Sequence, residues 1–149
     1  MDALKHPEKL KGLVLWDHQI KDISPLSNLT SLTYLDLSNN RISDISALKD
    51  LTKLWDLNLE GNQISDITVL SGLKELQCLY LQSNQITDIT ALSGLVKLDI
   101  LYIGYNPIQD MSCLNGLTGL ETLGVSNTKI SKDQIEEFQA AHKDCTIEQ

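Results

Sequence analysis

A repeat of 22 residues runs through most of the chain, and no other feature limits its possible folds as strongly. From Leu29 onward the sequence divides into units with the pattern LxxLxxLxLxxNxIxDIxxLxx, which begin at Leu29, Leu51, Leu73, Leu95 and Leu117. Three columns of the repeat are aliphatic in all six copies: Leu13, Leu35, Leu57, Leu79, Leu101 and Leu123; Leu15, Leu37, Leu59, Leu81, Ile103 and Val125; and Ile20, Ile42, Ile64, Ile86, Ile108 and Ile130. A fixed period of this kind predicts a solenoid whose turns stack and share one core.

The paired leucines of each unit predict a short strand with one buried face, because side chains alternate along a strand. Strands that recur in the same direction every 22 residues stack into a parallel sheet. We expect about six such strands on the concave face of a curved, right-handed superhelix. The return segment IxDIxxL is too short for a long helix and predicts 3₁₀ turns on the convex face. The predicted class is therefore an α/β solenoid.

Two polar columns fit this architecture. An Asn follows each central strand, where an amide can satisfy backbone groups of its own and adjacent turns; these residues are Asn40, Asn62, Asn84 and Asn106. His18 and Thr128 replace Asn in the outermost repeats. An Asp precedes each short turn, where we expect N-caps; these are Asp22, Asp44, Asp66, Asp88 and Asp110. The alternative is an acidic ladder that binds cations, although capping already explains one Asp per turn.

The whole chain, residues 1–149, is predicted to be one domain, because its length is typical of one. Residues 1–11 form a short N-terminal cap, 12–130 about six repeats, and 131–149 a C-terminal cap. Ser131 is a good helix N-cap, and Ile135, Phe138 and Ala141 or His142 share one helix face that we expect to cover the last repeat. Residues 145–147 then predict an edge strand.

Charge and composition exclude several functions. The net charge of −8 without a basic cluster argues against nucleic acid and against an anionic membrane surface as partner. No apolar stretch approaches the roughly 20 residues of a membrane span. The first residues lack the apolar core of a signal peptide, so we expect a cytoplasmic protein, or a secreted or surface protein if the sequence is part of a longer one. Cys78, Cys113 and Cys145 are odd in number and have no metal spacing, which favours free thiols in a reducing compartment.

Nothing in the sequence predicts catalysis, a metal or a cofactor. No phosphate-binding glycine loop is present, and no histidine has a second ligand at metal spacing. A Cys–His nucleophilic pair has no local signature to support it. Cys113 occupies a column of Ala47, Val69 and Ala91, where it packs as a small residue. We therefore expect no enzyme.

The outward-facing strand positions carry the residues that do not repeat. Tyr80, Ile100, Tyr102 and Tyr105 form an aromatic patch beside Cys78, and Asp36, Asp56 and Glu60 form an acidic patch flanked by Tyr34 and Trp16. Exposed aromatics are typical interface anchors. The alternatives are that cross-strand stacking only stabilises the sheet, or that the acids hold Ca²⁺. The predicted partner-binding residues of the concave face are Trp16, Tyr34, Asp36, Asp56, Asn58, Glu60, Tyr80, Gln82, Ile100, Tyr102 and Tyr105.

At residues 40–54, 62–76 and 84–98 the strings NRISDISALKDLTKL, NQISDITVLSGLKEL and NQITDITALSGLVKL resemble the 22-residue leucine-rich repeats of bacterial internalins, and also the related repeats of a eukaryotic phosphatase regulatory subunit. The resemblance covers about residues 10–130. It implies a leucine-rich-repeat solenoid, and internalins as a family are secreted surface proteins that bind host receptors through the concave face. It names no particular partner.

These observations favour a non-catalytic, monomeric protein-interaction module, whose partner is a protein with a basic and apolar surface. Two alternatives stay open at this stage. One is a structural spacer within a larger secreted or surface protein. The other is a regulatory subunit of an enzyme such as a phosphatase.

Overall fold

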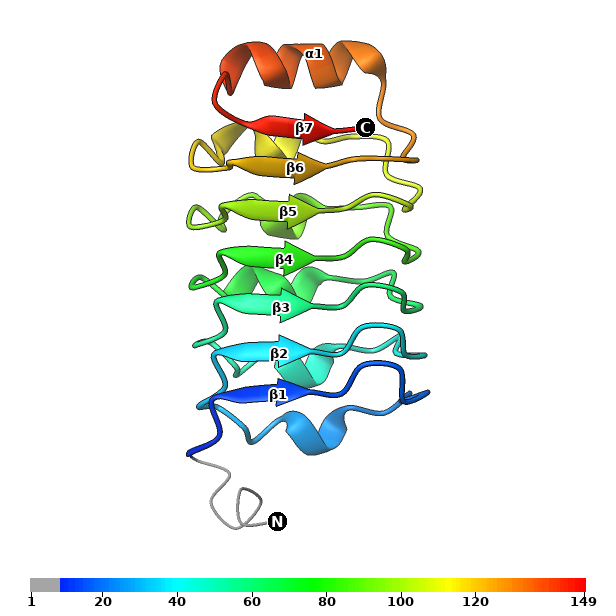
Figure 1. Cartoon of the computed structure of the whole chain (residues 1–149), viewed down its shortest axis with the longest axis vertical. Coiled ribbons are helices and arrows are strands. Elements are labelled where there is room, and N and C mark those ends of the chain that lie inside the picture. The colour runs from blue at the N-terminus through cyan, green and yellow to red at the C-terminus, as the bar shows by residue number, and fades with distance from the viewer. Residues whose placement is uncertain (1–8) are drawn as a thin grey trace.

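The structure is a computed structural model that describes residues 9–149, and it contains one sheet of seven parallel strands stacked in chain order (Figure 1). Each strand has three residues: β1 Gly12–Val14, β2 Tyr34–Asp36, β3 Asp56–Asn58, β4 Cys78–Tyr80, β5 Ile100–Tyr102, β6 Thr122–Gly124 and β7 Thr146–Glu148. In β1 to β5 every residue pairs with the residue 22 positions further on, as Leu35 does with Leu57, whereas β6 pairs with β7 at a separation of 24 residues. The predicted leucine-rich-repeat solenoid is confirmed. The six predicted strands are β1 to β6, and β7 corresponds to the edge strand predicted at residues 145–147.

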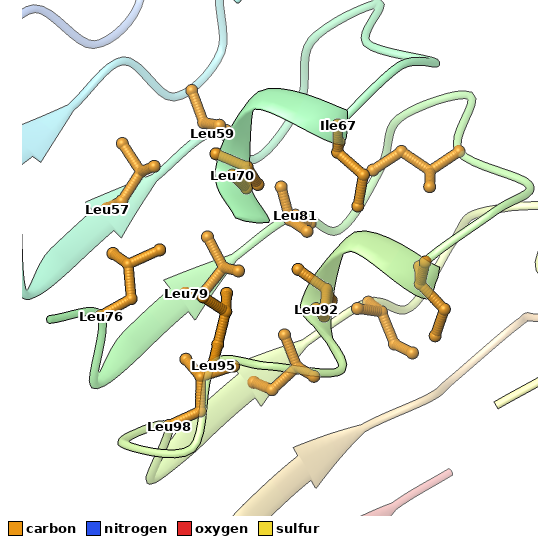
Figure 2. Close-up of a cluster of buried hydrophobic side chains, with 14 of the residues drawn as sticks. Leu57, Leu59, Ile67, Leu70, Leu76, Leu79, Leu81, Leu92, Leu95 and Leu98 are labelled. Carbon is orange, nitrogen blue, oxygen red and sulfur yellow. The ribbon is translucent and has the colours of Figure 1, made fainter. Parts of the chain in front are cut away.

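The repeated aliphatic columns make one continuous core between the sheet and the return segments. The middle residue of each strand from β2 to β6 is fully buried, as Leu57 and Leu79 illustrate, while its two neighbours face outward in most strands. Figure 2 shows how Leu57, Leu79 and the leucines of the return segments point into the same interior from successive turns. Because each turn covers the apolar face of the next, the core has no boundary between repeats.

The convex return path consists of the predicted 3₁₀ turns: η3 Ser24–Leu26, η4 Ser46–Leu48, η5 Thr68–Gly72, η6 Thr90–Leu92 and η7 Ser112–Gly116. The Asp column acts one position earlier than predicted. The residue at the N-cap is Ile or Met, and the preceding Asp accepts from the first backbone N–H of the turn, as Asp66 Oδ1 does from Thr68 N at 2.8 Å. This hydrogen bond lowers the pKa of the Asp66 carboxyl. The carboxylate therefore orders the backbone that enters the turn.

The Asn column joins neighbouring turns through buried hydrogen bonds. Asn62 Nδ2 donates to the carbonyl of Leu59 in its own turn at 3.1 Å and to that of Leu37 in the preceding turn at 3.0 Å. Its Oδ1 accepts from the Ile42 N–H of the preceding turn at 3.0 Å. Asn40, Asn84 and Asn106 repeat this arrangement. One amide per repeat thus satisfies backbone groups that the bend after the strand leaves unpaired.

A left-handed residue occurs at the same point of all six repeats, just before the Asn column. Its φ lies between 53° and 66° at Asp17, Asn39, Gly61, Ser83, Tyr105 and Asn127. Asp, Asn and Gly tolerate this conformation, whereas a bulky residue is strained in it. Tyr105 is therefore the one large side chain in this column, at a position that ordinarily favours small or polar residues.

The C-terminal cap matches its prediction. Helix α1, Lys132–Ala141, begins after Ser131, whose Oγ accepts from the Gln134 N–H at 3.3 Å, and it buries Ile135 and Phe138 over the last repeat (Figure 1). Strand β7 follows and pairs with β6, with Ile147 opposite Leu123. Of the predicted N-terminal cap, residues 1–8 lie outside the described residues.

Candidate partner-binding face

The outward side of the seven strands forms a surface that we call the exposed sheet face; it is the concave face of the solenoid. Two residues of each central strand lie on it, for example Asp56 and Asn58 of β3 on either side of buried Leu57. The positions just beyond each strand, such as Glu60 and Gln82, continue the surface. In contrast to the core columns, these columns change residue type from repeat to repeat.

Two tyrosines form the centre of this face. The rings of Tyr80 and Tyr102 stack with their centroids 5.6 Å apart and their planes 11° from parallel. The Tyr102 ring extends over Gly124, where any Cβ would collide with it, and its hydroxyl donates to Glu148 Oε1 at 3.1 Å. Partial burial, and for Tyr102 the neighbouring Glu148 carboxylate, raise the pKa of both phenols. The face therefore presents a fixed aromatic pair.

The acidic patch lies on the two preceding strands. Burial, and then the nearby Asp36 charge, raise the pKa of the Asp56 carboxyl, and the pKa of the Tyr34 phenol is raised by burial and by both acids. Asp36 also has a structural task, because its Oδ1 accepts from the Ser38 N–H at 2.9 Å. Asn58 does the same for the Glu60 N–H at 3.0 Å. These two predicted site residues thus support the turn that follows their strands.

A hollow of about 250 Å³, which we call the tyrosine–glutamate hollow, opens at the C-terminal end of the exposed sheet face. It is lined by Glu60, Gln82, Ser83, Tyr102, Gly104, Tyr105, Gly124, Ser126 and Glu148. Gln82 Nε2 donates to Glu60 Oε2 at 2.9 Å across adjacent repeats. Glu60 of the predicted acidic patch therefore meets Tyr102 and Tyr105 of the predicted aromatic patch, while Asp36 and Asp56 lie outside the hollow.

The structure brings some of the predicted site residues together and separates others. Glu60, Gln82, Tyr102 and Tyr105 line the hollow, and Tyr80 stacks beside it. Tyr34, Asp36, Asp56, Asn58 and Ile100 share the exposed sheet face outside the hollow, and Trp16, 55% exposed, lies beyond β1 near the other end of the sheet.

Sequence reasoning missed Glu148, because β7 does not follow the repeat. It also passed over Gly104 and Gly124, whose small size is visible only as breaks in their columns.

The described residues show no group of three or more His, Cys, Asp or Glu side chains that could hold a metal ion. Burial raises the pKa of all three thiols, to about 11 for Cys113, whose Sγ donates to the Ile89 carbonyl at 3.3 Å. These thiols are thus less nucleophilic than an exposed cysteine. No helix in residues 9–149 has the length and apolar character needed to cross a membrane.

The repeats identify the class of protein. The family model for leucine-rich repeats, in units of two copies, matches residues 8–50, 30–72 and 52–94, which together are more than half of the chain. The chain belongs to the leucine-rich-repeat family. The comparison with curated proteins finds no match.

Among solved structures, the chain is similar to two internalins of Listeria monocytogenes. It is 38% identical to the internalin inlF with a TM-score of 0.89, and 41% identical to internalin C2 with a TM-score of 0.88. These matches cover 93% and 94% of this chain but only 40% and 61% of the two internalins. A leucine-rich-repeat protein of Leptospira interrogans matches 95% of this chain and 38% of its own length, with 26% identity and a TM-score of 0.87. The chain thus spans part of the length of each relative.

Proposed function

We propose that the chain is a non-catalytic protein-interaction module that binds a partner protein through the exposed sheet face. The main support for this proposal is that the residues that differ between repeats lie on the exposed sheet face. Every core column keeps its aliphatic character through the repeats, whereas the columns of the exposed sheet face change residue type. Tyr34 is the one tyrosine of its column, and the column of Tyr80 and Tyr102 holds Val, Asp, Asn and Gly in the other repeats. Stacked solenoid turns commonly use such a surface for binding.

Stability of the sheet does not account for this face. Cross-strand stacking explains one pair, Tyr80 with Tyr102, whose contribution is about 0.5–1 kcal/mol. It leaves the half-buried Asp56 unexplained, because burial and the nearby Asp36 charge oppose ionisation of the Asp56 carboxyl, whereas Asp36 supports the turn after its own strand. Aromatic anchors beside uncompensated carboxylates instead match a partner surface that is both apolar and basic.

The test is affinity capture with the intact chain and its Tyr80→Ala/Tyr102→Ala variant, against lysate of its own cells and against a panel of extracellular proteins. Circular dichroism checks that the variant folds, which we expect because neither ring belongs to the core. The matched control is Trp55→Ala, an aromatic residue 42% exposed that precedes β3 and lies outside the face.

A partner captured by the intact chain and by Trp55→Ala, but lost by the double variant, supports the proposal. A partner that all three proteins retain places binding elsewhere and contradicts it. If no protein is captured from either source, a structural spacer becomes the better hypothesis. If the captured protein is an enzyme subunit, regulation of that enzyme becomes the specific form of the module's function.

A further inference from the structure

We propose that the tyrosine–glutamate hollow binds a single arginine side chain presented by a peptide segment of the partner protein. This inference rests on the proposed function and adds to it the chemistry of one contact. The hollow is lined by Glu60, Gln82, Tyr102, Tyr105 and Glu148, and Gly104 also belongs to its lining.

The hollow carries negative charge that no cation neutralises. Glu60 Oε2 accepts from the Gln82 amide at 2.9 Å, and Glu148 Oε1 accepts from the Tyr102 hydroxyl at 3.1 Å, so neutral donors hold both carboxylates. None of the residues that line the hollow is Lys or Arg. In the described part of the chain, the ion pairs lie elsewhere, at Lys49–Asp50, Lys97–Glu75 and Lys132–Glu136. A pair of positioned carboxylates favours a cationic ligand.

The side-chain amide of Gln82 has one hydrogen-bonding atom, its Oε1, that lacks a donor within residues 9–149. Its amide nitrogen is used by Glu60, which can only accept, so the orientation of the amide is fixed by chemistry. Its Oε1 is buried and has no donor among the described residues. An unpaired buried acceptor destabilises the free protein. A guanidinium has five N–H donors, enough to serve a carboxylate and an amide oxygen together.

The shape selects arginine over a larger ligand. About 250 Å³ is less than the roughly 300–1,000 Å³ of pockets for small molecules, so one side chain fills it. Tyr102 and Tyr105 line the hollow, and a guanidinium stacks on tyrosine rings more readily than an ammonium does. A Cβ on Gly104 would lie 2.8 Å from the Ser126 carbonyl oxygen, so at this part of the lining the backbones of two repeats approach each other closely.

Two backbone N–H groups at the hollow also lack an acceptor among residues 9–149. In β2 and β3 the N–H two residues beyond the exposed Asp36 or Asn58 is bound by that side chain. In β4 and β5 the equivalent exposed residues are tyrosines, and no acceptor in residues 9–149 receives the N–H of Gln82 or Gly104. Carbonyl groups next to a bound arginine can accept these bonds, which favours a peptide over a free amine.

The experiment is an NMR titration of the 15N-labelled intact chain with acetyl-Gly-Arg-Gly-amide, in about 150 mM NaCl to screen long-range attraction. The comparison peptide contains citrulline, which keeps the shape of arginine without its charge. We expect saturable shifts of the Gly104, Tyr105 and Gly124 amides with the arginine peptide at millimolar concentration, and affinity for the citrulline peptide at least ~10-fold weaker.

Variants localise the contact. Glu60→Gln and Glu148→Gln each keep the side-chain shape and are expected to weaken arginine-peptide binding by about 10-fold. Glu75→Gln, outside the hollow, is expected to leave it unchanged. Equal affinity for the citrulline peptide, shifts centred on the convex Asp column, or no saturable shift overturns the inference. If that happens while a partner is still captured through Tyr80 and Tyr102, the arginine contact is wrong and the proposed function stands.

Discussion

Replacing Tyr105 by Asn is expected to make the solenoid more stable while it weakens binding. Tyr105 has a φ of 54°, and its counterparts in the other repeats are Asp, Asn, Gly or Ser. A left-handed conformation costs roughly 1–2 kcal/mol for an ordinary L-residue, and Asn tolerates it better. The Tyr105 side chain is 57% exposed, so its removal sacrifices little buried surface. The net gain is about 1 kcal/mol in the free energy of unfolding.

For a chain of 149 residues a gain of this size corresponds to a rise in Tm of about 2–4 °C. Differential scanning calorimetry of both proteins measures it. The reciprocal change, Asn127→Tyr, places a tyrosine at the same left-handed position of the last repeat and is expected to lower Tm by a similar amount. The binding half of the prediction uses the arginine-peptide titration, in which Tyr105→Asn reduces affinity.

An unchanged or lower Tm for Tyr105→Asn would contradict the prediction, because Tyr105 would then contribute packing that exceeds its conformational cost. A variant that is more stable and binds as well as the original chain would refute only the functional half. In that case the strained tyrosine would have no task in the hollow.

Three further changes test the architecture. Asn62→Ala removes one buried amide and its bonds to both neighbouring turns, so urea denaturation should show a loss of about 3 kcal/mol, whereas exposed Gln63→Ala stays within about 0.5 kcal/mol. The folded-state pKa of Asp66 lies below its ordinary value of 3.8, so the stability that this carboxylate contributes is present above pH ~4 and is lost as pH falls through the folded pKa. Asp66→Asn should therefore reduce the pH dependence of the free energy of unfolding below pH ~4. An unchanged pH dependence would contradict this. The pKa of Cys113 is raised to about 11, so iodoacetamide at pH 8 should alkylate it far more slowly than a free cysteine, with mass spectrometry as the readout; equal rates would show an accessible thiolate.

Most of the fold could be predicted because every repeat has the same pattern of apolar and polar positions. The Leu and Ile columns specify the strands and the core, and the Asn column specifies how turns join. An assignment that is ambiguous in one repeat is therefore resolved by the same positions in the other repeats. The last strand lies outside the repeat. An edge strand was predicted at residues 145–147, and β7 pairs Thr146, Ile147 and Glu148 with β6, but the period of 22 does not give the register of this pairing.

The sequence predicted which positions belong to the candidate site, but not which of their side chains contact one another. A period of 22 shows that Glu60 and Gln82 occupy adjacent strands, yet it does not show that their side chains bond. It also does not show that the Tyr102 ring crosses Gly124 to reach Glu148. Such contacts depend on side-chain direction and on missing Cβ atoms. The left-handed column could have been found in the sequence, since Asp17, Asn39, Gly61, Ser83 and Asn127 recur at the period around Tyr105.

Three departures from the repeat converge on one surface, and each has a cost. Tyr80 and Tyr102 cannot accept the backbone N–H bond that Asp36 and Asn58 accept in their strands, and each missing bond lowers stability by about 1 kcal/mol. Tyr105 occupies a left-handed position at a cost of similar size. The stacking of Tyr80 on Tyr102 offsets only part of this sum. Several residues of this surface lower the stability of the fold, whereas every core column stays aliphatic. Stability therefore does not explain these residues, and binding is the function that such a surface can serve.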